Sequence, residues 1–180
     1  MADSRLMDTR AEGERGAAFL RLADAHLDAA YRLARVILRD PNEAQDATHD
    51  AVVQAWRMWS TLRDASRFER WFDRILVNIC RNRLERTSRS RATNISEDVA
   101  LAAGDPFSQA LDRDLLGSAI TALPPDQRVV VVLRYYLDLP LDEIAIRLDV
   151  PAGTVRSRLH YALKRLHAAI GSTEAEGTRR

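Results

Sequence analysis

The stretch Leu141–Leu166, LDEIAIRLDVPAGTVRSRLHYALKRL, contains two apolar runs at helical spacing, interrupted by Asp149-Val150-Pro151. Within each run the apolar residues recur three and four positions apart, as on one face of an amphipathic helix. Proline cannot occupy the interior of a helix but suits its first turn. Asp149 belongs to the few residue types that tolerate a left-handed backbone in a tight turn. The stretch therefore predicts two short helices joined by a turn, a helix-turn-helix.

The second of these helices is basic. It carries Arg156, Arg158, Lys164 and Arg165, and no acid occurs between Pro151 and Ile170. Its first turn, AGT with Thr154, is small and polar, so the helix could enter a DNA major groove end-on. The alternative is a solvated basic helix in an ordinary helical bundle. We favour DNA binding because the turn chemistry and the charge asymmetry agree.

Composition places the chain among globular proteins. It has 180 residues, 46% hydrophobic and 29% charged, and a net charge of +1. The single cysteine, Cys80, lies in an apolar helical run, which excludes a disulfide framework and predicts a buried thiol. The first residues lack a hydrophobic signal core, and no apolar run reaches membrane-spanning length. We therefore expect a cytoplasmic protein without membrane insertion.

The N-terminal half predicts helices over residues 17–38 and 40–60, after a loose polar segment 1–16. Asp40 is the expected N-cap of the second helix, with Pro41 at its first position and Glu43 completing a capping box. The apolar side of this helix is expected to consist of Ala44, Ala47, Ala51, Val52, Ala55, Trp56 and Trp59. Its first turns also carry acidic and polar residues that packing does not require, namely Asp46, His49 and Asp50.

A third helix is predicted over residues 66–86, and it combines an apolar stripe with many arginines. The stripe consists of Phe68, Trp71, Phe72, Ile75, Leu76 and Ile79. The polar residues include Arg74, Arg81 and the amides Asn78 and Asn82. Aromatic rings and guanidinium groups stack on unpaired bases, and amides bond to base edges, which suits single-stranded or distorted nucleic acid. Spacing alone equally allows a core helix with a solvated basic face.

Residues 87–105 show no sustained period and contain turn-forming residues, which indicates a linker. Fully extended, it could reach roughly 60 Å. Helical period returns over residues 111–123, and Pro124-Pro125 separates that helix from one over 126–137, whose apolar run Val129–Leu133 should be central to a second core. Residues 171–180 are expected to form a small polar tail. The predicted fold is all-α, with two small helical domains joined by a flexible linker and a helix-turn-helix in the second.

No catalytic or metal-binding constellation is present in the sequence. The histidines, His26, His49, His160 and His167, lack partners at metal-ligand spacing and are expected to be isolated surface residues. Ser157 has no nucleophile elbow around it, and the seven glycines form no phosphate-binding loop. We therefore expect neither an enzyme nor a cofactor or metal.

Two blocks together carry a resemblance. The segments EAQDATHDAVVQAWRMW and RWFDRILVNICRNRLER, followed by LPPDQRVVVVLRYYLDLPLDEIAIRLDVPAGTVRSRL, resemble a bacterial RNA polymerase sigma factor of the extracytoplasmic-function (ECF) type. The resemblance covers about residues 17–170, with both blocks in the family's order. It implies a region 2 domain at 17–88, a linker at 89–106 and a region 4 domain at 107–172. Its implied partners are the polymerase core, through its clamp coiled coil and flap, promoter DNA, and an anti-sigma factor.

The same resemblance assigns roles to residues of this chain. Asp46, His49, Asp50 and Gln54 would face the clamp coiled coil. The minus-ten element would be read by Trp71, Arg74, Asn78, Arg81 and Asn82. The minus-thirty-five element would be contacted by Thr154, Arg156, Ser157, Arg158, His160 and Lys164, with Arg158 near the DNA backbone. The linker resembles a segment that threads towards the RNA exit path, where acidic residues would mimic RNA.

Some positions depart from the family pattern. The family usually has Gln-Glu where this chain has His49-Asp50, and glycine where Asp138 and Asp149 stand. Near Pro140 and Leu141 it usually has an aromatic residue or serine. The promoter sequence cannot be derived, because family members vary at the position of His160.

Two other functions fit parts of the sequence. One is a helix-turn-helix repressor or activator whose N-terminal domain dimerises or binds a ligand. The other is an interaction module that only sequesters partners. The basic aromatic helix over residues 66–86 discriminates between them and a sigma factor, because a repressor of closed duplex DNA does not need it.

Overall fold

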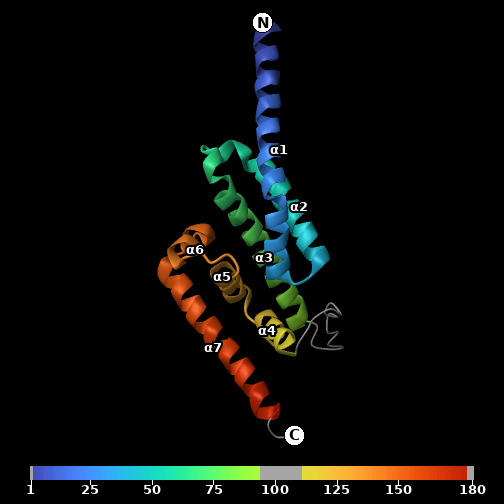
Figure 1. Ribbon diagram of the computed structural model, residues 1–180. Coiled ribbons are helices and arrows are strands. Elements are labelled where there is room, and N and C mark those ends of the chain that lie inside the picture. Colours follow the sequence, from blue (N-terminus) through green and yellow to red (C-terminus); the bar gives the residue numbers. More distant parts are fainter. Residues whose placement is uncertain (1, 94–110, 178–180) are drawn as a thin grey trace. The chain divides into compact units, whose positions relative to one another are not determined.

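The computed structural model describes the backbone of residues 2–93 and 111–177, and the side chains of residues 13–90 and 116–171. Every regular element in these ranges is helical, which confirms the all-α prediction (Figure 1). The elements are α1 (Ala2–Leu38), α2 (Pro41–Met58), η1 (Trp59–Thr61), η2 (Ala65–Arg67), α3 (Phe68–Thr93), α4 (Leu111–Thr121), α5 (Pro125–Tyr135), α6 (Leu141–Leu148) and α7 (Ala152–Gly177). The chain divides into two compact units, Met1–Cys80 and Arg81–Arg180. The linker predicted at 89–106 overlaps α3 up to Thr93, and the rest of it lies outside the described residues.

In the first unit, α1 and α2 pack together through small side chains. Ala44, Ala47, Ala51 and Ala55 are fully buried along one side of α2. Alanines every three or four residues let two helices approach closely, and larger residues of α1, such as Leu33 and Ile37, fill the remaining core. The start of α2 is the predicted one: the Asp40 carboxylate accepts hydrogen bonds from the amides of Asn42 and Glu43 at 2.8 and 2.9 Å.

Aromatic side chains join α1 and α2 to the start of α3. The Phe19 ring lies 5.2 Å from the Trp56 ring and 6.1 Å from Phe68, and Phe68 stacks on Phe72 at 5.5 Å. These centroid distances are those of favourable aromatic pairs. Cys80 is buried, as predicted.

A short turn leads into α3 through η2, and Asp64 caps it. The Asp64 carboxylate accepts hydrogen bonds from the Ser66 hydroxyl at 2.7 Å and the Ser66 amide at 3.0 Å. These bonds, followed by the charge of Arg67, lower the pKa of Asp64. A lowered carboxyl pKa stabilises the fold above the ordinary pKa and loses that effect as the pH falls through the lowered value.

Three expectations for the first unit were wrong. The backbone of residues 2–16 is helical, not loose; the segment lacks proline and is rich in alanine, arginine and glutamate, which favour helix. Trp56 is 51% exposed, because one edge of its ring packs on α1 at Gly16 while the other faces outward. His26 is half-buried: its Nδ1 lies 2.8 Å from the Leu22 carbonyl oxygen and its ring 5.4 Å from Phe68.

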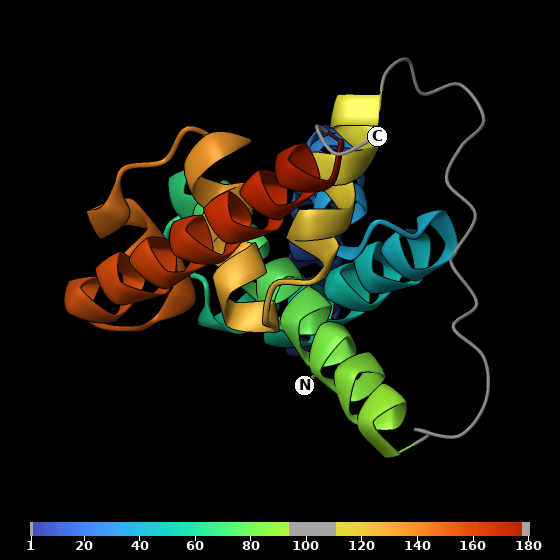
Figure 2. The ribbon, with the colours of Figure 1, turned by 90° about the horizontal axis from the view of Figure 1, so that it is seen from below.

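In the second unit, α7 lies against α4, α5 and α6 (Figure 2). The central run Val129–Leu133 of α5 is buried throughout, as predicted. Val155, Ala162 and Leu166 form the buried side of α7. The helix continues to Gly177, into the segment expected to be a small polar tail, because alanine and glutamate there continue a helix readily.

The turn of the helix-turn-helix has the geometry that the sequence predicts. Asp149 is left-handed, with φ 56° and ψ 47°, and the Val150 amide donates to the Ala145 carbonyl at 3.1 Å. This pattern closes the C-terminus of α6 in the way that glycine usually does. Asp138, the other position where the family has glycine, is also left-handed, with φ 49°.

We expect Asp149→Val to destabilise the protein by about 1–2 kcal/mol, because a β-branched side chain is strained in this conformation. Asp149→Gly is the matched control and should stay within about 1 kcal/mol of the unaltered protein. Denaturant unfolding measures both. Equal stability of the valine and glycine variants would contradict the role of this turn.

Two buried cations complete the second unit. Arg128 is 6% exposed, and its Nη2 donates to the carbonyl oxygen of Thr121, the last residue of α4. Arg147 is 7% exposed, and its Nε lies 3.2 Å from the Glu143 carboxylate. A cation at a helix C-terminus and an acid–base pair four residues apart both stabilise helices.

Candidate nucleic-acid and polymerase interfaces

Four of the residues predicted on the recognition helix share one exposed face of α7. At 100° per residue, Arg156, Ser157, His160 and Lys164 fall within an arc of about 100°. All four are exposed, and the buried side chains of α7 point the other way. The Ser157 hydroxyl donates to the Thr154 carbonyl at 3.0 Å, which leaves its oxygen to accept a bond from outside. We call this set the α7 face.

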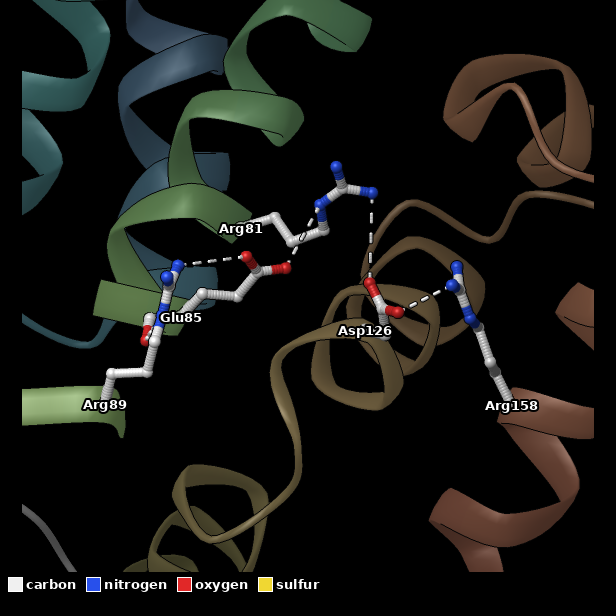
Figure 3. Close-up of polar contacts among 5 residues, drawn as sticks. All are labelled: Arg81, Glu85, Arg89, Asp126 and Arg158. Carbon is white, nitrogen blue, oxygen red and sulfur yellow. Dashed lines mark hydrogen bonds and ion pairs between the residues drawn. The ribbon is translucent and has the colours of Figure 1, made fainter. Parts of the chain in front are cut away.

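Thr154 and Arg158 do not belong to this face. They point about 110° and 150° away from its centre on the same helical geometry, and both are partly buried. The Arg158 guanidinium lies 2.6 Å from the carboxylate of Asp126, in the first turn of α5 (Figure 3). A charge-assisted contact of this length is strong and directional.

The minus-ten candidates lie along one side of α3. Trp71, Arg74, Asn78, Arg81 and Asn82 fall within an arc of about 100°. Arg74 and Asn82 are exposed, and the other three are half-buried. We call this set the α3 face. The opposite side of α3 carries the buried Phe72, Leu76 and Cys80.

Trp71 also belongs to the aromatic core. Its ring lies 5.9 Å from Phe68 and 6.4 Å from Trp59, both tilted. One side of the indole is therefore occupied by protein, and only the remaining part could meet a base. Trp71 therefore anchors the start of the α3 face in the aromatic core, and only its uncovered part is available for binding.

The sequence reasoning missed an acid on the α3 face. Glu85 is one turn beyond Arg81, and its carboxylate lies 3.8 Å from Arg81 and 3.7 Å from Arg89 (Figure 3). The i, i+4 spacing on both sides could have predicted these pairs. Glu85 holds the two arginines along the helix, and it opposes the approach of further phosphates at this end of the face.

The predicted polymerase-contacting residues form a third surface, on α2. Asp46, His49, Asp50 and Gln54 are all exposed. The first three point away from the buried alanines, whereas Gln54 lies only about 20° around the helix from Ala47. We call this set the α2 face. It lies on a different helix from the α3 and α7 faces and differs from them in charge: it carries two acids, whereas the α7 face carries none.

A helix-turn-helix with an exposed acid-free face, together with a helix that displays arginines, amides and an aromatic ring, indicates a nucleic-acid-binding protein. Comparison with known proteins identifies the family. Residues 22–90 match the family Sigma-70 region 2, and residues 113–166 match Sigma-70, region 4. The chain belongs to the RNA polymerase sigma factors of the ECF type, which bind the polymerase core and direct promoter-specific transcription initiation.

Curated relatives match over most of their length. The RNA polymerase sigma-E factor of Streptomyces avermitilis is 33% identical over 154 residues, which cover 83% of each chain. The ECF RNA polymerase sigma factor SigM of Mycobacterium tuberculosis is 33% identical over 170 residues, covering 94% of this chain and 85% of the relative. The resemblance seen in the sequence is thereby confirmed.

Two solved structures share the fold. The sigma factor RpoE from Bartonella quintana, solved with the anti-sigma factor NepR, has a TM-score of 0.65 and 21% identity, covering 85% of this chain and 96% of its own. CnrH, solved with the cytosolic domain of CnrY, has a TM-score of 0.60 and 23% identity, covering 93% and 97%.

Among the described residues, none of the helices is long and apolar enough to span a membrane. In the same ranges, His, Cys, Asp and Glu side chains form no cluster that could hold a metal ion.

Proposed function

We propose that the three faces divide the work of a sigma factor. The α2 face binds the polymerase core, the α3 face binds the minus-ten element as it melts, and the α7 face reads the minus-thirty-five element in duplex DNA. The observation that carries this proposal is that most candidates on each helix share one exposed side, although Thr154 and Arg158 lie outside the α7 face and Trp71 also packs in the aromatic core. The protein acts as a regulator and not as an enzyme, in the cytoplasm where polymerase works.

The charge of the α2 face decides which kind of partner it fits. Two carboxylates, Asp46 and Asp50, lie one helical turn apart with His49 beside them, and all three are exposed. Such a surface would repel DNA phosphates and attract a basic surface. We therefore assign the α2 face to the clamp coiled coil of polymerase. A separate contact, between the second unit and the flap of the core, follows the family resemblance.

Charge reversal tests the α2 face. We expect Asp46→Lys with Asp50→Lys to weaken binding to the polymerase core at least about tenfold, because like charges would then meet across the interface. The fold should persist, since both side chains are exposed. Affinity is measured by titrating labelled protein with core enzyme, and folding by circular dichroism.

The matched control is Asp24→Lys with Asp28→Lys on α1. These acids are also exposed and one turn apart, so the change in net charge is the same. This control should bind the core as tightly as the unaltered protein. Equal loss in both double variants would show that only overall charge matters, and no loss in the α2 variant would remove this assignment.

An anti-sigma factor is a further partner that we propose, because the Bartonella relative was solved with one. A protein of this kind would act by competing with the polymerase core. The test is whether a candidate regulator and the core enzyme exclude each other on the labelled chain. Simultaneous binding of both would contradict the proposal.

A further inference from the structure

We propose that Asp126 is a positioning residue for promoter recognition. Its ion pair with Arg158 fixes the rotation of α7 about the helix axis. This inference rests on the proposed reading of the minus-thirty-five element by the α7 face. It reassigns Arg158, which the family resemblance places near the DNA backbone, to a contact inside the protein. The carrying observation is the 2.6 Å ion pair between Arg158 Nη2 and Asp126 Oδ2 (Figure 3).

The position of Asp126 on α5 also supports the proposal. It lies in the first turn of α5, where the helix dipole stabilises an acid. Pro124, the residue that precedes this helix, provides no side-chain cap. Asp126 therefore adds negative charge where the open amides of α5 favour it, and it binds a cation of α7. Its other oxygen, Oδ1, lies 3.9 Å from Arg81 Nη1, a longer contact than the 2.6 Å pair with Arg158 (Figure 3).

Arg158 differs from the DNA-facing residues of α7 in exposure and in direction. Its side chain is 22% exposed and that of Asp126 is 37% exposed. Arg156, by contrast, is exposed, and it lies on the α7 face about 160° from Arg158. A phosphate approaching Arg158 would also approach the Asp126 carboxylate and be repelled by it. Arg158 is therefore poorly placed to hold DNA and well placed to hold α5.

The geometric consequence concerns the rotation of α7. Its buried side is apolar, with Val155, Ala162 and Leu166, and apolar contacts alone resist rolling of a helix weakly because they have no preferred direction. A short ion pair is directional. Anchoring Arg158 to α5, one turn from Val155, fixes the direction in which Arg156 and His160 point. Base reading requires that precision, whereas nonspecific attraction to phosphates does not.

The test uses the full chain bound to polymerase core. A duplex promoter is first selected by this holoenzyme from a library with randomised minus-thirty-five sequence. Discrimination is then measured as the ratio of affinities for the selected duplex and its single-base variants, at several salt concentrations. The variants are Asp126→Asn, Arg158→Gln, both together, and the charge-swapped pair Asp126→Arg with Arg158→Asp.

We expect each single variant to lower discrimination about fivefold or more and to leave the salt dependence unchanged. The double neutral variant should be no worse than either single one, because the two residues act as a unit. The charge-swapped pair should recover part of the discrimination. Recovery by the swap also guards against misfolding, since a variant that failed to fold for lack of either residue would not be rescued by exchanging them.

The alternative, in which Arg158 contacts DNA, predicts different changes in affinity for the same variants. If Arg158 binds a phosphate, Arg158→Gln should weaken all sequences equally and lower the salt slope by about one. Asp126→Asn should then strengthen all sequences, because a competing anion is removed. That pair of results would overturn the proposal, as would unchanged discrimination in both single variants. If the unaltered holoenzyme itself shows no minus-thirty-five discrimination, the function proposed for the α7 face fails, which is a distinguishable result.

Discussion

With Asn78 and Asn82 both changed to alanine, the polymerase complex should still bind promoter DNA but should leave it closed. The two amides lie one helical turn apart on the α3 face, and Asn82 is exposed. Amide groups pair with the edges of unstacked bases, which exist only once the strands separate. Losing both should reduce the open complex at least about tenfold, the effect of about 1.4 kcal/mol. Permanganate reactivity of unpaired thymines is the measurement.

The matched control is Glu69→Gln, on the opposite side of α3 and also exposed. It should leave thymine reactivity unchanged. Core binding should be unaffected in both variants, because neither change touches the α2 face. Full reactivity in the double alanine variant would show that this side of α3 does not contact the melted strand.

Changing Arg156 to alanine should flatten discrimination among minus-thirty-five sequences. Arg156 is exposed near the N-terminus of α7, the end that a major groove admits. An arginine bidentate to guanine discriminates against other bases by about 1–3 kcal/mol, which corresponds to roughly 5–150-fold in affinity. The measurement is binding of the holoenzyme to a panel of single-base variants of a selected promoter, at several salt concentrations.

Lys164→Ala is the comparison on the same face, two turns further along α7. Since a helix leaving the groove meets phosphates there, this variant should weaken all sequences about equally and lower the salt slope by roughly one. Uniform loss in the Arg156 variant would instead make Arg156 a phosphate contact. Base reading would then pass to Ser157 and His160.

Features set by neighbouring residues could be predicted from the sequence. The Asp40 cap depends on the four consecutive positions 40–43, and the left-handed turn at Asp149 depends on the residues around one proline. The grouping of Asn78 with Asn82, and of Arg156 with His160, follows from helical periodicity alone. These local features placed each candidate face on its helix.

Features set by contacts between helices could not be predicted. Nothing in the spacing indicates that Arg158 meets Asp126, because the residues are far apart in sequence and both belong to types that usually face water. For the same reason the buried state of Arg128 was missed; its partner is a backbone carbonyl on another helix. Trp56 was placed on the apolar side of its helix, but its large exposed fraction was not predicted, because periodicity gives the direction of a side chain and not how much of a large ring its neighbours can cover.

Helix ends were missed where no strong stop signal exists. Segment 2–16, which was expected to be loose, and the end of α7, which was expected to be a polar tail, contain good helix formers and no proline, so helix continues through both. Polarity by itself predicts exposure, not the absence of a helix.

One measurement tests the central claim, that this chain directs polymerase through the three faces. Purified core enzyme is incubated with a promoter library, with the chain or without it, and RNA 5′ ends are mapped. We expect initiation at defined positions only when the chain is present, with common minus-ten and minus-thirty-five elements upstream of them. Loss of these start sites with the Asp46→Lys, Asp50→Lys variant, and their retention with the α1 control, would complete the result. Equal, scattered initiation with and without the chain would contradict the account.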